Sequence, residues 1–219
     1  MPTSTFFNLP EEKRQRILDL AVEEFAHNDY DSASVSRIVE QAGIAKGSLY
    51  QYFDGKAGLY AYLLELLRQA KSDFLAAAGA PDPQDGLFAY LRRLFRQSVA
   101  FELEHPLLAQ LGYRATYGNS PLPSGLLAGA RQATQEYFEK LVREGQQRGE
   151  IRPEADPRAA AFVFTAVMDG LGRYLAGQEG AAGQVAQSGH YPVDSPAVQQ
   201  AFDQVMAVCE LGLATGGGK

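Results

Sequence analysis

The chain of 219 residues contains no tryptophan, one cysteine and three histidines. Its single cysteine, Cys209, excludes a disulfide framework within the chain. His27, His105 and His190 do not have the spacing of a metal cluster, and no candidate base lies near the cysteine in the sequence. We therefore expect that the protein binds no metal or cofactor and is not an enzyme. Cys209 follows an apolar helical pattern and is expected to be a small buried side chain, with a redox or intersubunit role as the alternative.

Long apolar runs are also scarce. The longest lies around residues 159–168, which is much shorter than the roughly 20 apolar residues needed to cross a bilayer. The N-terminus lacks the charged and then apolar layout of a signal peptide. We therefore expect a cytoplasmic protein with no membrane partner.

Positive charge is in deficit, with a net charge of −6 that argues against a general polyanion binder. Residues 1–60 alone carry six cations against nine acids. This does not exclude DNA, because acids on a far face are screened beyond a Debye length of roughly 8 to 10 Å. A specific DNA binder of modest non-specific affinity remains compatible with the charge.

The hydrophobic pattern has helical periodicity throughout and shows no strand alternation or internal repeat. It predicts an all-α protein of about nine helices, which is long enough to bury a sizeable core. Loops are expected at residues 79–86, with the sequence GAPDPQDG, and at the glycine-rich stretch from Gly177 to Asp194. Residues 1–9 are interpreted as a short arm with apolar side chains that contact the first long helix.

The stretch around residues 34–53 predicts a helix-turn-helix. Ser34 is a favourable N-cap, and apolar residues recur at helical spacing from Val35 to Ala42. Gly43 then ends the first helix, because glycine readily adopts the left-handed conformation of a tight turn. A second helix runs from about Lys46 to Phe53. Such a helix pair also occurs as a plain hairpin in all-α proteins, so this spacing does not by itself require DNA.

The outer face of this second helix is unusual for a solvated helix, since it has two tyrosines, a serine, a glutamine and a lysine. Glutamine can pair with a base edge, hydroxyls and lysine can hold phosphates, and glycine allows a close approach. Lys56 lies at the start of the next helix, where a phosphate is also favoured. The candidate DNA-binding residues are Ser34, Arg37, Lys46, Gly47, Ser48, Tyr50, Gln51, Tyr52 and Lys56.

A longer pattern includes this motif. It consists of Ile17, Ala21, Phe25, Ala26, Tyr30, Ser34-Val35, Ile38, Ala42-Gly43-Ile44, Lys46-Gly47-Ser48-Leu49-Tyr50, Tyr52-Phe53, Lys56 and Leu59. With this pattern the segment from about residue 16 to residue 64 resembles the N-terminal DNA-binding domain of the TetR family of bacterial transcription regulators. The family usually has serine or threonine where this chain has Ala45, so a helix cap of about 1 kcal/mol is missing. The resemblance implies a helix-turn-helix domain over residues 1–55 and a helical effector-binding and dimerisation domain over residues 56–219.

The last two helices are expected from about Arg158 to Ala176 and from about Pro196 to Ala214. Both are apolar on nearly all sides, which is typical of buried helices. A second copy of the chain is one way to cover them, forming a four-helix interface like that of TetR regulators; a central core helix is the alternative. A two-fold dimer would place two DNA-reading helices about one DNA turn apart, as a palindromic operator requires.

The middle helices are expected to enclose a small-molecule effector. Glu102 lies on an apolar stripe, where a carboxylate is costly unless it is paired. It either pairs with Arg96 or Arg114, or faces a cavity and contacts a polar or cationic group of the effector. The candidate effector contacts are Phe95, Val99, Glu102, His105, Tyr113, Tyr117, Tyr137, Phe138 and Phe162.

Two classes of function are consistent with these patterns. The first is a homodimeric DNA-binding regulator, most simply a repressor that an effector releases from its operator; an activator would have the same sequence features. The second is a helical small-molecule carrier or enzyme that uses the aromatic cavity.

Overall fold

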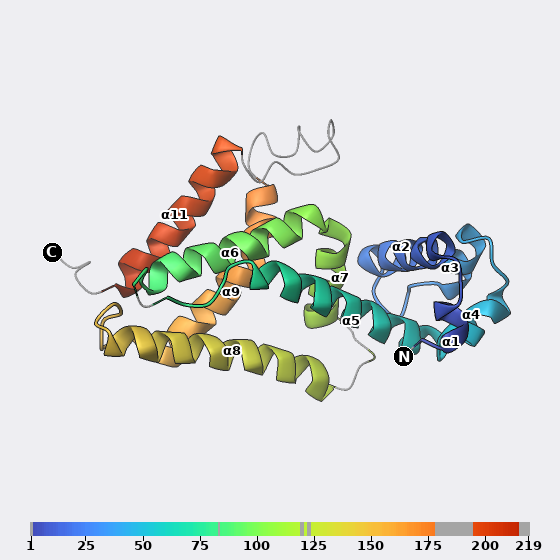
Figure 1. Cartoon of the computed structure of the whole chain (residues 1–219), viewed down its shortest axis with the longest axis horizontal. Coiled ribbons are helices and arrows are strands. Elements are labelled where there is room, and N and C mark those ends of the chain that lie inside the picture. The colour runs from blue at the N-terminus through green and yellow to red at the C-terminus, as the bar shows by residue number, and fades with distance from the viewer. Residues whose placement is uncertain (1, 83, 119–120, 122–123, 178–194, 215–219) are drawn as a thin grey trace. The chain divides into compact units, whose positions relative to one another are not determined.

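The computed structural model describes residues 2–82, 84–118, 121, 124–177 and 195–214. These residues are helical throughout, apart from turns and one isolated bridge between Ile151 and Ala214, which confirms the all-α prediction (Figure 1). The described part contains ten helices where about nine were expected, and the short arm of the prediction is in fact the first of them. The helices are α1 (Ser4–Phe7), α2 (Glu11–His27), α3 (Val35–Gln41), α4 (Lys46–Tyr52), α5 (Gly55–Ala76), α6 (Leu87–Glu104), α7 (Pro106–Tyr117), α8 (Ser124–Gln147), α9 (Pro157–Ala176) and α11 (Pro196–Leu213).

Local capping determines where several helices begin. The Ser34 side chain accepts a hydrogen bond from the backbone of Arg37 at the start of α3. Asp156 and Ser195 cap α9 and α11 in the same way, and each is followed by a proline in the first turn. Helix α4 begins after Ala45 and has no side-chain cap, as the sequence implies.

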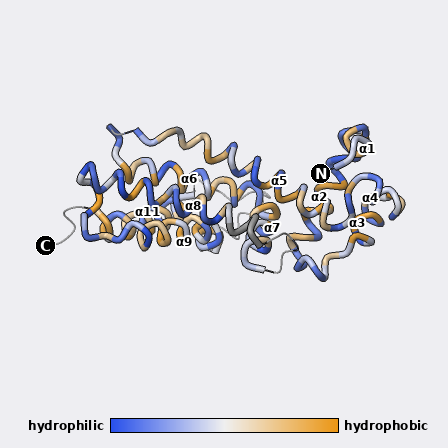
Figure 2. The backbone as a smooth tube through the Cα atoms, turned by 90° about the horizontal axis from the view of Figure 1, so that it is seen from below, coloured by the Kyte–Doolittle hydropathy of each residue, from blue (hydrophilic) through white to orange (hydrophobic). Residues whose placement is uncertain are grey.

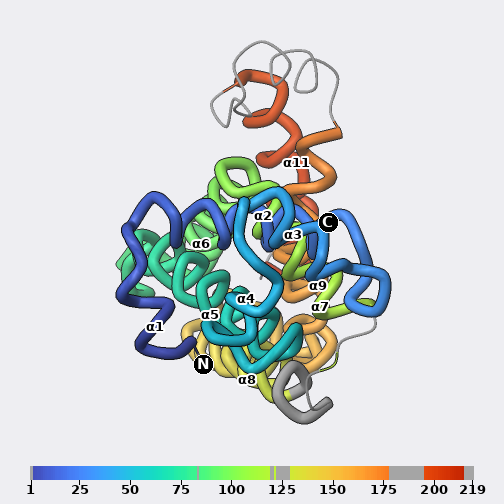
Figure 3. Tube along the Cα trace, turned by 90° about the vertical axis from the view of Figure 1, so that its right-hand side faces the viewer, coloured from blue at the N-terminus to red at the C-terminus, as the bar shows by residue number. Residues whose placement is uncertain are grey.

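The chain divides into two compact units. The head unit comprises Met1–Ala70 and His105–Leu127, and Figure 3 shows its helices α2, α3 and α4 close together. Its core is formed by buried side chains of α1 to α5 together with Leu111 and Ala115 of α7. These units are defined by packing, whereas the division predicted from the sequence at residue 55 separates a DNA-binding from an effector-binding function. That functional division stays a prediction.

Helix α7 is packed along α2 within the head unit. Nε of Arg114 donates to the carbonyl of Ala26 at 2.7 Å, and the same guanidinium pairs with Asp29. Helix α7 is therefore joined to α2 by this hydrogen bond and by apolar packing, and to the turn after α2 by the ion pair with Asp29.

The body unit comprises Lys71–Glu104 and Ala128–Lys219. Helix α9 packs against both α6 and α11, and apolar positions recur along these helices between polar ones (Figure 2). The core includes Leu91, Phe95, Phe138 and Phe164, all essentially inaccessible. Cys209 is also buried here, as predicted, and burial raises the pKa of its thiol.

Helix α9 is the one helix of the described residues that is long and apolar enough to span a membrane. The uninterrupted apolar run at residues 159–168, which is too short to span a bilayer, is only the central part of this helix. One face of α9 nevertheless packs into the body core through Ala161, Phe164 and Leu171. Helix α9 is thus a partly buried core helix of the body unit.

The opposite faces of α9 and α11 are apolar and exposed. Phe162 and Tyr174 on α9 are 67% and 51% accessible, while Val208 and Leu211 on α11 are 72% and 68% accessible. The sequence predicts burial for these helices, and within this chain only the face of each helix that packs into the body core is buried. Of the loop predicted from Gly177 to Asp194, residues 178–194, which include His190, lie outside the described residues, as do the terminal residues 215–219.

Helices α6 and α9 approach closely at Gly172. A Cβ atom at this position would lie 2.7 Å from Cδ and 2.8 Å from Cβ of Glu102 on α6. Any larger residue would therefore have to displace a helix or the Glu102 side chain.

We expect Gly172→Ala to lower the free energy of unfolding by about 1 to 3 kcal/mol because it overpacks this contact. Gly170→Ala, two residues earlier in α9, is the matched control, because a Cβ there meets no atom within 4 Å. That change should stabilise the helix by up to about 1 kcal/mol. Chemical denaturation measures both, and equal effects of the two substitutions would contradict a close contact at Gly172.

Candidate nucleic-acid interface and ligand site

Helix α4 presents a polar face because its apolar face is anchored in the head core. Leu49 is fully buried, and Phe53, the residue at the end of the helix, is 1% exposed. The side chains on the other face remain accessible, with Tyr50 57% exposed. Lys46, Gly47 and Gln51 are also exposed, as the sequence predicts, whereas Ser48, which was expected to face outward too, is half-buried.

Tyr52 was predicted to face outward, but the structure buries it. It is only 6% exposed, and its ring centroid lies 6.0 Å from that of Phe6. The cause is α1, which covers this end of α4. A sequence pattern within α4 cannot reveal such a cover, since it comes from residues more than 40 positions away.

The start of α3 is organised by Glu24 of α2. Its carboxylate accepts the backbone N–H of Ser34 at 2.6 Å and Nε of Arg37 at 3.0 Å. The hydrogen bond from Arg37 is the main cause that lowers the pKa of Glu24. Arg37 is therefore held by an acid in the head unit. The sequence analysis missed Glu24, because nothing in the local pattern separates it from its neighbour Glu23.

Lys56 lies in the first turn of α5, as predicted, and is held in place by two contacts. Its ammonium nitrogen lies 4.5 Å from the centre of the Tyr30 ring and donates to the carbonyl of Asp31 at 3.2 Å. These contacts fix the position of the cation beside the loop that precedes α3.

Some of the candidate effector contacts lie in the body unit. Phe95, Val99 and Phe138 are buried in its core, and the ring centroids of Phe95 and Phe138 are 6.0 Å apart. Tyr137 is 39% exposed, and its hydroxyl is hydrogen-bonded to that of Tyr90. Burial, followed by this hydrogen bond, raises the pKa of Tyr137.

The remaining aromatic candidates lie elsewhere. Tyr113 and Tyr117 belong to α7 of the head unit, are 39% and 49% exposed, and have ring centroids 4.8 Å apart. His105 stands at the start of the same helix. Phe162 is on the exposed face of α9. The structure therefore does not bring the nine predicted residues together in one unit.

Glu102 is mostly buried against α9 of the body unit, and of its two predicted alternatives the pairing with Arg96 or Arg114 was wrong. Arg114 pairs with Asp29, and the guanidinium of Arg96 lies over the Phe202 ring, 5.3 Å from its centre. Burial raises the pKa of Glu102 to about 7. Lys71 and Arg173 act against this rise, and Asp169 adds to it.

Ser98 lies one helical turn before Glu102 and was missed by the sequence analysis. It is 1% exposed, and its hydroxyl has no hydrogen-bond partner among the described residues. A buried hydroxyl without a partner is costly, so such a group is suited to meet a ligand or a water molecule. The available signal was its i−4 spacing from Glu102 on the same apolar stripe.

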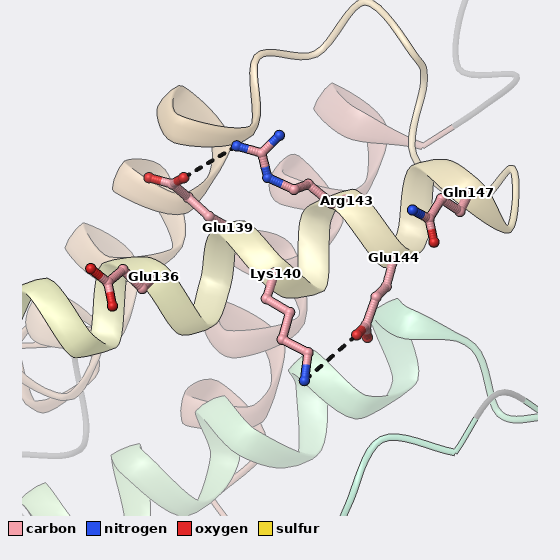
Figure 4. Close-up of a pocket in the computed structure, with 6 residues that line it drawn as sticks. All are labelled: Glu136, Glu139, Lys140, Arg143, Glu144 and Gln147. Atoms are coloured by element: carbon pink, nitrogen blue, oxygen red, sulfur yellow. Dashed lines mark hydrogen bonds and ion pairs between the residues drawn. The ribbon is translucent and has the colours of Figure 1, made fainter.

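A hollow on the surface of α8 lacks the buried polar groups that Glu102 and Ser98 supply on α6. All six lining residues come from α8 alone (Figure 4). Lys140 pairs with Glu144 at 3.8 Å, and Arg143 pairs with Glu139 at 3.5 Å. These i, i+4 pairs are typical of a solvated helix face, on which each pair contributes about 0.3 to 0.5 kcal/mol.

Two family models match the chain, one in its N-terminal part and one in its C-terminal part. Residues 17–63 match the model of bacterial regulatory proteins of the tetR family, and all nine candidate DNA-binding residues lie within this range. Residues 85–214 match the tetracyclin repressor-like C-terminal domain, which is more than half of the chain. The chain belongs to the TetR family. It is therefore a DNA-binding transcriptional regulator, and because the family is not enzymatic, the enzyme alternative is dismissed.

Individual relatives agree with this assignment. The crystal structure of a TetR family transcriptional regulator from Chloroflexus aurantiacus has a TM-score of 0.88 and 41% identity, covering 98% of this chain and 99% of that one. An HTH-type transcriptional repressor of Streptomyces coelicolor is 31% identical over 162 residues, or 72% of this chain and 77% of that protein. The A-factor receptor protein of Streptomyces griseus is 27% identical over 177 residues, which are 78% of this chain but only 59% of that longer protein.

The buried carboxyl of this TetR regulator predicts a pH-dependent stability. Because the pKa of Glu102 rises from 4.5 to about 7 on folding, the native state binds more protons than the unfolded state between these values. The free energy of unfolding should therefore fall as the pH rises through this window, and the penalty is complete above pH 7.

Glu102→Gln removes this titrating group, so the variant should not lose stability in the same window. The free energy of unfolding of the variant minus that of the wild type should therefore increase by roughly 1 to 3 kcal/mol from about pH 4.5 to pH 8. Urea denaturation across this range measures the difference. Glu104→Gln, at an exposed position of the same helix, is the control and should show a constant difference. A constant difference for Glu102→Gln as well would refute a buried titrating carboxyl.

Proposed function

We propose that this regulator is a homodimeric repressor that binds a palindromic operator through α4 and leaves it when a small molecule binds in the body unit. The observation that supports this best is the polar, exposed face of α4 on a helix whose other face is anchored by Leu49 and Phe53. We also propose a cytoplasmic location, where the operator is found.

The exposed side chains of α4 have distinct roles in this proposal. Gln51 pairs with a base edge in the major groove, and Gly47 allows the backbone to approach the duplex. Lys46 and the Tyr50 hydroxyl contact phosphates. Ser48 of the same helix and the neighbouring residues Ser34, Arg37 and Lys56 complete the phosphate contacts at the edge of the groove.

The second subunit is proposed to cover the exposed faces of α9 and α11. An apolar surface that includes Phe162, Val208 and Leu211 is costly to leave in water, and it marks a protein interface when it is contiguous. A two-fold axis there repeats α4 in the second subunit, and an operator with half-sites about 34 Å apart would match both copies.

The effector is proposed to be a largely apolar molecule with at least one polar group. Phe95, Val99 and Phe138 offer apolar contacts in the body unit. Ser98 offers a hydroxyl without a hydrogen-bond partner among the described residues, and Glu102 offers a carboxyl one helical turn further along α6. The Streptomyces griseus relative is named as an A-factor receptor protein, which supports a receptor role for this chain too. Binding would favour an arrangement whose α4 helices no longer match the operator.

Substitutions on α4 test the DNA-binding surface. Lys46→Ala and Tyr50→Ala should weaken binding to all duplexes, because they remove phosphate contacts, and Lys46→Ala should lower the slope of log affinity against log salt by about 1. Gln51→Ala should instead relax the preference at one base pair, by about 1 to 3 kcal/mol. Fluorescence anisotropy with a duplex selected by the wild-type protein from a random pool measures all three.

Lys140→Ala on the charged face of α8 is the control for loss of a cation, and it should leave binding unchanged. Wild-type affinity in all three α4 variants would show that another surface contacts DNA.

The dimer interface is tested by placing a charge in the exposed apolar faces. The wild-type protein should have twice the 23.8 kDa mass of the chain, whereas Val208→Asp and Leu211→Asp should shift it towards a monomer. Gln199→Asp, an exposed position on the other side of α11, should remain dimeric. Sedimentation velocity measures the mass, and dimeric Val208→Asp and Leu211→Asp proteins would place the interface elsewhere.

A further inference from the structure

The C-terminal end of α4 is held by a residue near the beginning of the chain. Oγ1 of Thr3 donates to the carbonyl of Gln51 at 2.6 Å, and the backbone N–H of Thr3 donates to the carbonyl of Tyr52 at 2.9 Å. The last carbonyls of a helix have no partner within the helix itself. Thr3 therefore satisfies two of them from 48 and 49 positions away.

The side chain of Thr3 does not serve its own helix. Thr3 is the N-cap residue of α1, a position where a threonine hydroxyl usually accepts a hydrogen bond from the backbone. No such side-chain bond is made in α1, and the hydroxyl instead donates to α4. The geometry of this residue thus favours the stabilisation of α4 over that of α1.

Apolar packing holds α1 in the position that these bonds require. Phe6 is fully buried, and its ring centroid lies 4.7 Å from that of Phe53 and 6.1 Å from that of Tyr62. Nη1 of Arg14 on α2 donates to the carbonyl of Phe7 at 3.0 Å. Helix α1 is thus joined to α2, α4 and α5, and Figure 1 shows it beside the end of α4.

Helix α4 depends on such external contacts because it is short. Its seven residues form only two turns, and a helix of this length is not stable alone in water. Its N-terminus lacks a side-chain cap, since Ala45 stands at the capping position. Its orientation is therefore set by buried side chains and by the bonds at its C-terminal end.

We propose that residues 3–7 form a clamp that orients α4, and that Thr3 is a positioning residue for operator recognition. The inference rests on the proposed role of α4 in reading DNA. Thr3 acts through the backbone of Gln51, the residue proposed to pair with a base, and itself needs no contact with the duplex. Without the hydroxyl bond, the end of α4 becomes less ordered, and base pairing by Gln51 becomes less specific.

Thr3→Val tests the clamp in the full-length protein, because valine has the shape of threonine but lacks the hydroxyl. The affinity for a duplex selected by the wild-type protein should fall by about threefold to tenfold, the range expected for one net hydrogen bond. Affinity for a scrambled duplex at low salt should not change, since non-specific binding depends on charge and tolerates small changes of orientation. Thr3→Ser restores the hydroxyl and should restore the specific affinity.

Thr5→Val is the matched control, because it makes the same chemical change at an exposed position of the same short helix. The clamp is refuted if Thr3→Val keeps the wild-type ratio of specific to non-specific affinity, or if Thr5→Val lowers this ratio equally. Gln51→Ala and Tyr50→Ala in the same assay separate the two proposals. If these weaken binding and Thr3→Val does not, only the clamp is wrong; if they have no effect, the proposed DNA surface is wrong.

Discussion

Burial of one side of α4 is the constraint on which the DNA-binding surface depends. Leu49 and Phe53 are anchored in the head core, so a two-turn helix that could not exist alone presents a constant outer face. The same apolar cluster includes Phe6, which explains why the first residues of the chain reach the end of α4. Hydrogen bonds from Thr3 then act on a helix that packing has already placed.

In the head unit the polar side chains of α4 are on the outside, whereas in the body unit two polar side chains lie within an apolar core. Ser98 and Glu102 lie on α6 where it packs on α9, and Gly172 makes room for the carboxyl. Both polar groups lower the stability of the core unless they find partners. Such a cost is consistent with a site that a ligand completes, because the ligand then stabilises the arrangement it binds.

The candidate site was predictable where a residue's role follows from its own helix. The cap at Ser34 and the outward direction of Tyr50 and Gln51 followed from local pattern and helical period. Tyr52 was misplaced because α1 covers it, and the arginine partners proposed for Glu102 were wrong because they depended on packing between helices. Glu24 went unnoticed for a similar reason, since its partners belong to another helix.

The amino-acid order was sufficient for the all-helical class, the helix starts and the family, because periodicity, caps and motif spacing are local properties of the chain. Which helix face is covered and which carboxyl is buried could not be predicted from the sequence, because both depend on contacts between distant segments. Thr3 and Gln51 are 48 positions apart, and folding alone brings them within hydrogen-bonding distance.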